Sequence, residues 1–198
     1  MRQFVVIGHD APADADFTLE DLAGGAGRLD LLCRAVTAAL LRSHGVREDT
    51  RVHLVIADQV TVSFRGADVR RLNPDERSTA ALIRQALEQR REAVGHQSVE
   101  TTPGVSITNL GVEQILDRIT DGHEVIVLDA AGRPASSVEP PEDSVFILSD
   151  HRDFTDAEDA LLSTSAANRL SLGPVAIHTD QAITIAHNWL DTNGFTRY

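Results

Sequence analysis

The stretch RLSLGPVAIHTDQAITIAHNWLDTNG (residues 169–194) decides the fold of this chain. A short apolar strand leads into a Leu-Gly-Pro loop, and the apolar residues that follow at helical spacing predict a long helix. Gly173 and Pro174 end the strand, so backbone N–H and C=O groups of the loop are free to bind a polar small molecule. We therefore expect this loop to form the binding site of a cofactor.

The basic residues of the chain are all arginine. The sequence contains 18 arginines, no lysine and 30 acidic residues, which gives a formal net charge of -12. A carboxylate-rich surface without lysine is typical of adaptation to high salt, where ions screen the repulsion between hydrated acidic groups. Acidity normally argues against nucleic-acid binding, but at molar salt hydrogen bonding, stacking and shape carry recognition. We therefore expect a halophilic source and do not exclude RNA as a partner.

The length of the chain suits one domain with its own core. At 198 residues and 42% apolar content it can bury most of the surface of its unfolded form, which predicts a single domain over residues 1–198. The few apolar residues before Gly8 fall far short of a signal peptide or a membrane span, which predicts a cytoplasmic protein. Cys33 is the one cysteine, and its apolar neighbours predict a buried packing role.

Strands and helices alternate along the sequence. Periodicity predicts helices over residues 28–43, 74–91, 112–120 and 156–163, besides the C-terminal helix. Apolar runs predict strands over 4–7, 52–57, 60–64, 105–107, 123–129, 145–150 and 169–172, with 52–57 and 60–64 as a hairpin. The polar stretch 95–104 is either a surface loop or part of a site, and 132–144 is expected to be a loop. The pattern predicts an α/β fold whose mostly parallel sheet carries helices on both faces.

Three predicted strands of the second half end in polar loops. Leu128-Asp129 follows one strand, Ser149-Asp150 follows the next, and Leu172-Gly173 follows the third. Because ligands bind beyond the carboxyl ends of parallel strands, these loops can form a single pocket, although three unrelated strand ends would give the same pattern. The chain lacks a GxGxxG motif and a Walker-type lysine loop, which disfavours nucleotide hydrolysis.

Several motifs, in one order along the chain, resemble a known family. They are GRLDLLCR (27–34), PDER (74–77), TPG (102–104), VFILSDH (145–151) and SLGPVAIHTDQAITIAHNWLD (171–191). Together they resemble the archaeal tRNA pseudouridine-54 N1-methyltransferases, the TrmY family of the SPOUT superfamily. The resemblance covers nearly the whole chain, and the ordered set is specific although each tetrapeptide alone would be weak.

The resemblance implies a cofactor, a topology and a set of binding residues. SPOUT proteins thread the C-terminal segment into a deep trefoil knot, bind S-adenosylmethionine in that knot and work as homodimers. Ser149 stands where family members carry Gly and would crowd the cofactor slightly, while Ala182 stands where they carry Cys and rules out a required thiol. The cofactor-binding positions implied in this sequence are Leu128, Ser149, Ser171, Leu172, Gly173, Pro174, Val175, Ala176, Ile177 and Ala182.

The implied chemistry is simple. Methyl transfer from a sulfonium to N1 of pseudouridine needs in-line positioning and loss of the N1 proton, but neither a metal nor a covalent nucleophile. Asp30 and Asp75 are the candidate proton acceptors, and neighbouring Arg28 and Arg77 can bind phosphate or orient the carboxylates. The alternatives are local ion pairing at a helix N-terminus for Arg28 and Asp30, and helix initiation for residues 74–77. The alternatives carry equal weight. If either pair acts in catalysis, we favour Arg28 and Asp30, because GGAG (24–27) lets the backbone approach a flipped base.

Other functions remain open at this stage. His151, His178 and His187 match no zinc motif, so no metal site is expected, and the last helix is expected to pack in the core or at a dimer interface. The implied function is N1-methylation of pseudouridine 54 in the T-arm of tRNA. The alternatives are a ribosomal RNA pseudouridine N1-methyltransferase and a noncatalytic RNA-binding scaffold with a SPOUT fold. Binding of S-adenosylmethionine separates the scaffold from the enzymes.

Overall fold

The computed structural model describes residues 1–166 and 168–197. Its helices are α1 (Leu29–Leu40), α2 (Glu76–Glu88), α3 (Val112–Ile119), α4 (Asp156–Ser165) and α5 (Thr179–Asp191), with 3-10 turns η1 (Arg90–Glu92) and η2 (Ala135–Ser137). Its strands are β1 (Arg2–Gly8), β2 (Leu41–Arg42), β3 (Gly45–Val46), β4 (Thr50–Ile56), β5 (Val60–Arg65), β6 (Val99–Thr102), β7 (Val105–Thr108), β8 (Glu124–Pro134), β9 (Ser144–Ser149) and β10 (Asn168–Ser171).

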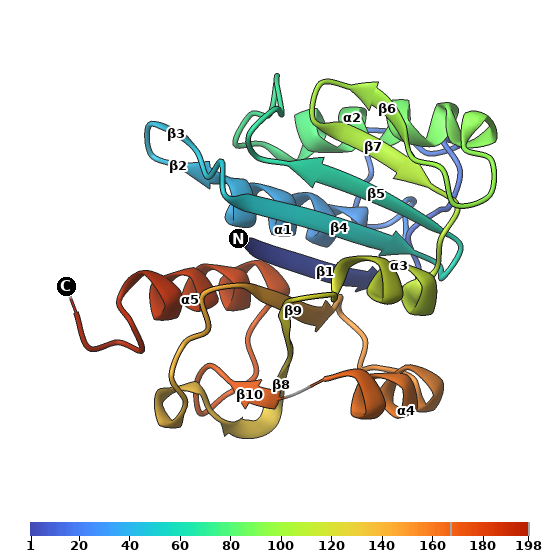
Figure 1. The fold of residues 1–198 in the computed structure, drawn as a ribbon. Coiled ribbons are helices and arrows are strands. Elements are labelled where there is room, and N and C mark those ends of the chain that lie inside the picture. The colour runs from blue at the N-terminus through green and yellow to red at the C-terminus, as the bar shows by residue number, and fades with distance from the viewer. Residues whose placement is uncertain (167, 198) are drawn as a thin grey trace.

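The strands build one mixed sheet at the centre of the molecule (Figure 1). In the described part of the chain, eight strands pair in the order β10-β8-β9-β1-β4-β5-β7-β6. The strands from β10 to β4 are parallel, whereas β5, β7 and β6 continue the sheet in antiparallel pairing. The prediction of a mostly parallel sheet is confirmed, as is the hairpin of β4 and β5. The parallel half brings the carboxyl ends of five strands to one edge.

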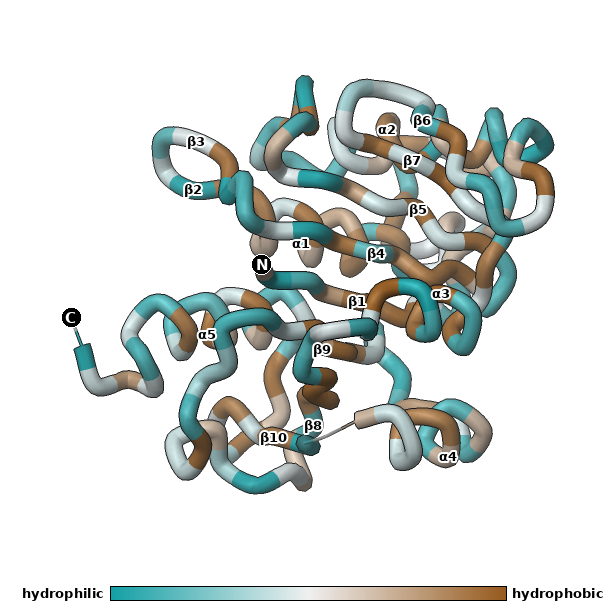
Figure 2. Tube along the Cα trace, viewed as in Figure 1, coloured by the Kyte–Doolittle hydropathy of each residue, from teal (hydrophilic) through white to brown (hydrophobic). Residues whose placement is uncertain are grey.

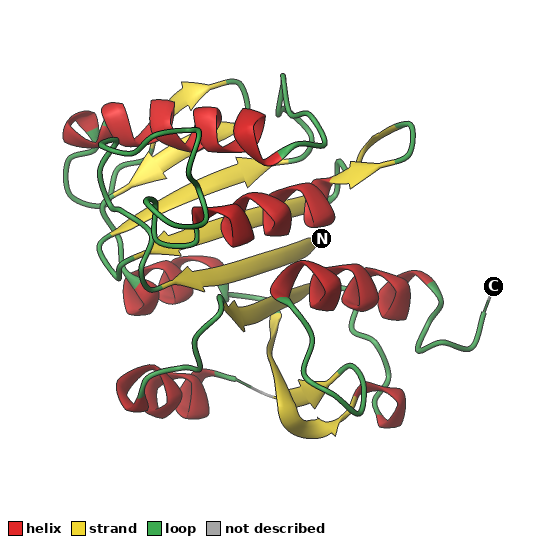
Figure 3. Cartoon of the chain, turned by 180° about the vertical axis from the view of Figure 1, so that it is seen from behind, coloured by secondary structure: helices red, strands yellow, loops and turns green. Residues whose placement is uncertain are grey.

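Helices cover both faces of this sheet, as predicted. α1, α2 and α5 lie on one face (Figure 3), and their buried residues form a core with Phe4, Val6 and Phe146. α3 and α4 pack on the other face around Val5 and Ile147. Among the helices of residues 1–166 and 168–197, none combines the length and hydropathy that crossing a bilayer requires.

Alternation along the strands assigns residues to these two faces. Val52, Leu54 and Ile56 of β4 join the core beneath α1, while Arg51 and His53 alternate with them. Figure 2 shows hydrophobic residues concentrated along the central strands, with hydrophilic residues in the loops and on the outer sides of the helices. Cys33 on α1 is fully buried in the core, which confirms its predicted packing role.

The structure differs from the sequence prediction at several element ends. α1 stops at Leu40, three residues earlier than predicted, because the chain turns there into the short β2–β3 hairpin. α2 ends at Glu88 and is followed by the 3-10 turn η1. β8 continues to Pro134, so the first residues of the predicted loop 132–144 belong to the strand. Hairpins and strand extensions this short carry too few periodic residues to be detected.

The polar stretch 95–104 is more regular than predicted. Its residues Val99–Thr102 form β6, the edge strand, which pairs with β7 through a register shift. Most of its residues are only partly buried, so an alternating apolar pattern is missing. Edge strands are commonly short and polar, which limits pairing with other chains.

Candidate functional site at the carboxyl ends of the parallel strands

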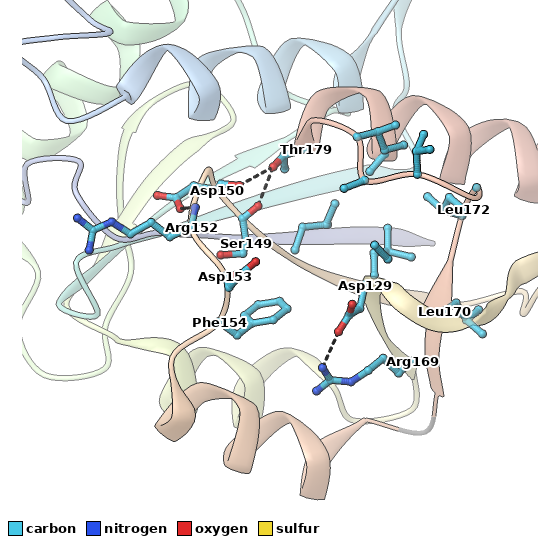
Figure 4. A pocket seen from close by; sticks show the side chains of 18 of the residues that line it. Asp129, Ser149, Asp150, Arg152, Asp153, Phe154, Arg169, Leu170, Leu172 and Thr179 are labelled. Carbon is cyan, nitrogen blue, oxygen red and sulfur yellow. Dashed lines mark hydrogen bonds and ion pairs between the residues drawn. The ribbon is translucent and has the colours of Figure 1, made fainter.

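The three polar strand ends singled out in the sequence meet at one cavity of about 370 Å³. Leu128 and Asp129 come from β8, Ser149 and Asp150 from the end of β9, and the loop after β10 closes a third side (Figure 4). The expectation of a single pocket is confirmed. The predicted binding residues that line it are Leu128, Ser149, Leu172, Gly173, Val175, Ala176, Ile177 and Ala182. Ser171, which is buried, and Pro174, which is exposed, lie beside it.

The N-terminus of α5 is tied to the end of β9. The Thr179 hydroxyl donates to the carbonyl oxygen of Ser149 at 2.7 Å, as Figure 4 shows. His178 precedes the helix, and its N–H donates to the side chain of Gln181, which caps the first turn. The contact between Thr179 and Ser149 holds the loop 172–178 across the cavity. The C-terminal segment and β9 therefore form one wall together.

The opposite wall is held by an ion-pair network that the sequence analysis missed. Arg169 donates to Asp129 at 2.7 Å and to Asp159 of α4 at 2.6 Å. Burial raises the pKa of Asp129, but the Ala131 N–H and Arg169 outweigh that effect and hold the pKa below its usual value. Asp129 is therefore ionised at neutral pH, and its pairing joins β8, β10 and α4.

The cavity fits S-adenosylmethionine. Its walls combine apolar side chains, which suit an adenine ring, with four carboxylates and two arginines, an acidic surplus that suits a sulfonium cation. In the described chain, the Ser149 hydroxyl is buried without a hydrogen-bond partner although Ser149 lines the cavity. A buried hydroxyl is rarely left unpaired, so this atom is placed to bond a polar ligand group.

His9 links the loop after β1 to the wall formed by Asp150. Its Nδ1 lies 3.0 Å from Asp150 Oδ1, its Nε2 lies 3.1 Å from Glu158 Oε2, and its N–H donates to Asp150 Oδ2 at 2.8 Å. Burial lowers the pKa of His9, but the hydrogen bonds and negative charges of both carboxylates outweigh it and raise the pKa above its usual value. When the ring is protonated, both of its nitrogens donate, which holds the residues after β9 in place.

This cluster predicts a pH dependence of stability. Because the pKa of His9 is higher in the folded than in the unfolded chain, its contribution is complete below about pH 6.5. It is lost as the pH rises through the folded pKa. We expect the Tm of the protein to fall over that range and the fall to be smaller in His9→Gln. Thermal unfolding of both proteins across neutral pH checks this, and equal slopes would contradict it.

Arg28 and Asp30 form a close pair at the same edge of the sheet. Arg28 Nε and Nη2 donate to the two carboxylate oxygens of Asp30 at 3.0 and 3.1 Å. Burial raises the pKa of Asp30, but the hydrogen bond and charge of Arg28, with the charge of Arg34, hold it below its usual value. Neither residue is among those that line the cavity, so this geometry shows the local ion pair and leaves the catalytic role a prediction.

The loop before this pair reaches the rim of the cavity. Gly27 has a φ of 54°, and a Cβ there would collide with the carbonyl group of Asp10. The Asp10 carboxylate in turn accepts from Arg152, a cavity residue, at 2.8 Å. Gly27 thus packs against Asp10, whose side chain pairs with a cavity residue, and the approach of GGAG to a base stays a prediction.

The second candidate pair is arranged differently. Asp75 caps α2 and accepts from the Ser78 N–H at 2.8 Å, while Arg77 is exposed and lies 3.9 Å from Glu20. These contacts support helix initiation, the alternative for residues 74–77. Arg34 connects the two motifs, because it lies 3.5 Å from Asp30 and 3.7 Å from Glu76.

The capping role of Asp75 gives a second prediction. Asp75→Ala removes the cap, so we expect a Tm about 2–4 °C lower, whereas Asp75→Asn keeps a capping oxygen and restores the Tm. Thermal unfolding measures both. If Asp75 instead accepts a proton, the Asn variant will retain its Tm and still lose methyl transfer, which would contradict a purely structural role.

Two of the three histidines considered in the sequence, His151 and His187, have different partners in the structure. His187 is buried against Phe4 and lies 3.0 Å from the Ala39 carbonyl oxygen, whereas His151 pairs with Asp10. Burial lowers the pKa of His187 to about 4. Over residues 1–166 and 168–197, no group of three or more His, Cys, Asp or Glu is placed to hold a metal ion.

Several cavity residues escaped the sequence analysis. Arg152, Asp153 and Phe154 line the cavity from the loop between β9 and α4, and Arg169 lines it from β10. The polar run after β9 was a signal for the first three. No sequence signal pointed to Arg169, or to His9 behind the cavity, because the partners of both lie far away along the chain.

The fold and the cavity define a class: α/β proteins that bind a small ligand beyond the carboxyl ends of parallel strands. The family model described as "Putative SAM-dependent RNA methyltransferase" matches residues 1–195, and the chain belongs to this family. It is 61% identical over its full length to the full-length tRNA (pseudouridine(54)-N(1))-methyltransferase of Haloarcula marismortui. It is 57% identical, again with full coverage of both chains, to the protein of the same name from Haloferax volcanii.

A solved structure shares the fold. The crystal structure of Archaeoglobus fulgidus Nep1 bound to S-adenosylhomocysteine superimposes with a TM-score of 0.67 at 14% identity, covering 96% of this chain and 97% of that one. The close sequence relatives come from halophilic archaea, as the lysine-free acidic composition predicts.

Proposed function

We propose that this chain is an S-adenosylmethionine-dependent methyltransferase that methylates N1 of pseudouridine at position 54 of tRNA. The observation that carries this proposal is the full-length match, at up to 61% identity, with curated proteins of that activity. The cavity with its unpaired Ser149 hydroxyl supports it independently. We further propose that the protein is cytoplasmic, which a tRNA substrate supports, and that the whole chain acts as one domain.

The cavity residues would hold the cofactor that supplies the methyl group. Leu128, Leu172 and Ile177 offer apolar walls, Ala182 leaves room at the start of α5, and the loop 172–178 offers backbone polar groups. The four carboxylates of the lining outnumber its two arginines, which would favour a sulfonium cation. The contacts of Thr179 and Arg169 would keep these walls in place.

Arg28 and Asp30 are proposed to handle the RNA and its proton. Asp30 is ionised, which is the form that accepts a proton, and its two oxygens hold the Arg28 guanidinium in one plane. Arg28 is partly exposed and can bind a phosphate or a base carbonyl. The N1 proton of pseudouridine would pass to Asp30 directly or through one water as the N–C bond forms, while the bond between the methyl group and the sulfonium sulfur would break and leave S-adenosylhomocysteine.

We further propose that the C-terminal segment is knotted and that the chain forms a homodimer. The spatial order β10-β8-β9 and the Thr179 contact with Ser149, 30 residues away, support threading of this segment past β9. Val175 and Ile177 at the cavity rim have exposed fractions of 67% and 37%, which a second copy of the chain would cover.

The direct test is methyl transfer in molar KCl from labelled S-adenosylmethionine to matched tRNA transcripts with uridine or pseudouridine at position 54. Label on the pseudouridine transcript alone is the expected result. Transfer only to ribosomal RNA would support that alternative instead. Failure to bind the cofactor would support a noncatalytic scaffold and contradict the proposed function.

A further inference from the structure

A second cleft lies on the α3 face of the sheet, at the opposite ends of the strands. It has a volume of about 420 Å³ and is lined from β1, β4, β5, β7 and α3. We name it the Arg51 cleft after the arginine at the start of β4. Gln3 of β1 lies in this cleft, and His9, which directly follows β1, is hydrogen-bonded to Asp150 of the cofactor cavity. At about 3.3 Å per residue the two sites are roughly 20 Å apart.

The sequence leaves this part of the sheet polar. Val60, Val62 and Phe64 of β5 point into the core beneath α1 and α2. The alternate residues Ser63 and Arg65 line the cleft, as do Ser106 and Thr108 of β7. Since Phe64 is fully buried on the other face, the rings left to the cleft are the imidazoles of His53 and His123, beside hydroxyl and guanidinium groups.

The charge of the Arg51 cleft opposes that of the molecule. Three arginines (Arg51, Arg65 and Arg118) and two acidic residues (Glu100 and Asp121) line it, whereas the whole chain has a net charge of -12. Over residues 1–166 and 168–197, neither Arg51 nor Arg118 forms a salt bridge. Arg118 Nη1 donates to the His96 carbonyl oxygen at 3.0 Å, so its other N–H groups and the guanidinium of Arg51 are left for an anion.

The floor of the cleft is a fixed hydrogen-bond chain. Burial, with the charges of Arg51 and Arg118, lowers the pKa of His53 to about 3, so its ring is neutral. Its Nε2 lies 3.0 Å from Gln3 Oε1 and must donate, so its Nδ1 accepts from the Ser63 hydroxyl at 2.8 Å. The Ser63 hydroxyl therefore donates its hydrogen bond within the protein and has no proton left to donate to a ligand.

Thr108 is different, because its hydroxyl is buried and has no hydrogen-bond partner in the described chain. The residue is 5% exposed and lines the cleft. A buried hydroxyl without a partner is costly unless a ligand or water completes it. One free donor at the floor and two available arginines at the rim match the oxygens of a phosphate group.

We propose that the Arg51 cleft binds the RNA backbone, taking a phosphate from a nucleotide remote from the one that is methylated. The inference rests on the proposed function, since tRNA is the polyanion this chain would meet. Guanidinium groups and a free hydroxyl match phosphate oxygens, which favours the sugar-phosphate backbone over a base. The distance between the sites assigns the phosphate to another part of the same RNA.

The test is tRNA binding by the full chain, measured by fluorescence anisotropy over a KCl series. We expect Arg51→Gln and Arg118→Gln each to weaken tRNA binding about tenfold. Each should also lower the slope of log affinity against log KCl concentration by about one, and raise KM with kcat unchanged. Thr108→Val should weaken tRNA binding and leave the Tm unchanged. If the hydroxyl were merely structural, this substitution would not weaken tRNA binding at an unchanged Tm. Arg42→Gln is the matched control, because Arg42 is exposed and donates to the Val46 carbonyl oxygen outside both sites.

Equal tRNA affinity in wild type, Arg51→Gln and Thr108→Val would overturn the Arg51 cleft as an RNA site. Binding is measured with an unmodified tRNA transcript. The affinity can therefore be determined even if the protein transfers no methyl group. A wild type that binds tRNA through Arg51 but transfers no methyl group would refute the proposed function and keep the cleft.

Discussion

Gly173→Val is expected to fold normally and to bind S-adenosylmethionine roughly 10- to 100-fold more weakly. Gly173 lines the cavity, and no heavy atom of the described chain lies within 4 Å of a Cβ placed there. The added side chain therefore meets the ligand space and not the protein. Overpacking of this kind costs about 1–3 kcal/mol, which gives the expected range of affinity. Isothermal titration calorimetry with the cofactor measures it.

Gly45→Val is the matched control for this prediction. Gly45 lies in β3, outside the cavity, and a Cβ there also has open space in the described structure. Both variants should keep the wild-type Tm, and Gly45→Val should keep the wild-type affinity. Unchanged binding in Gly173→Val would remove the loop 172–178 from the cofactor site.

Asp30→Asn should lower the rate of methyl transfer about 100-fold or more while leaving cofactor affinity unchanged. Asparagine keeps the size of the side chain and one oxygen for Arg28, but it cannot accept the N1 proton, and general-base catalysis contributes about 10²–10⁴-fold. Single-turnover transfer to pseudouridine-containing tRNA measures the rate. Arg28→Ala should weaken RNA binding or turnover and also leave cofactor affinity intact.

The alternative for Asp30 gives a different result. If the Arg28–Asp30 pair only stabilises the start of α1, Asp30→Asn will lower the Tm and change the rate by a few-fold at most. Asp117→Asn, an exposed carboxylate on α3, controls for the loss of one negative charge. Equal loss of cofactor binding and turnover in Arg28→Ala would show that Arg28 belongs to the cofactor site.

The strand-loop-helix segment at the C-terminus could be predicted from sequence because its signals are local. Gly173 and Pro174 mark the loop, and the helix after His178 carries apolar residues at helical spacing. The three strand ends could likewise be read as one pocket, since parallel strands end at one edge of the sheet. The element ends at Leu40 and Pro134 could not, because turns and strand pairing decide them.

The rest of the site depends on contacts between distant residues. His9 and Glu158 are 149 residues apart, and Asp129 and Arg169 are 40 apart, so no local pattern joins them. The same holds for the Arg51 cleft. Alternating polar residues in β5 and β7 predict only half-exposed strands, and the arginine from α3 reaches them through the fold.

The most direct test of this account is a crystal structure of the protein grown with S-adenosylhomocysteine. We expect the ligand between the ends of β8, β9 and β10, beneath the loop 172–178, with a polar atom bonded to the Ser149 hydroxyl. Ligand in the Arg51 cleft, or no ligand at concentrations that saturate binding in solution, would contradict the assignment of the cofactor site.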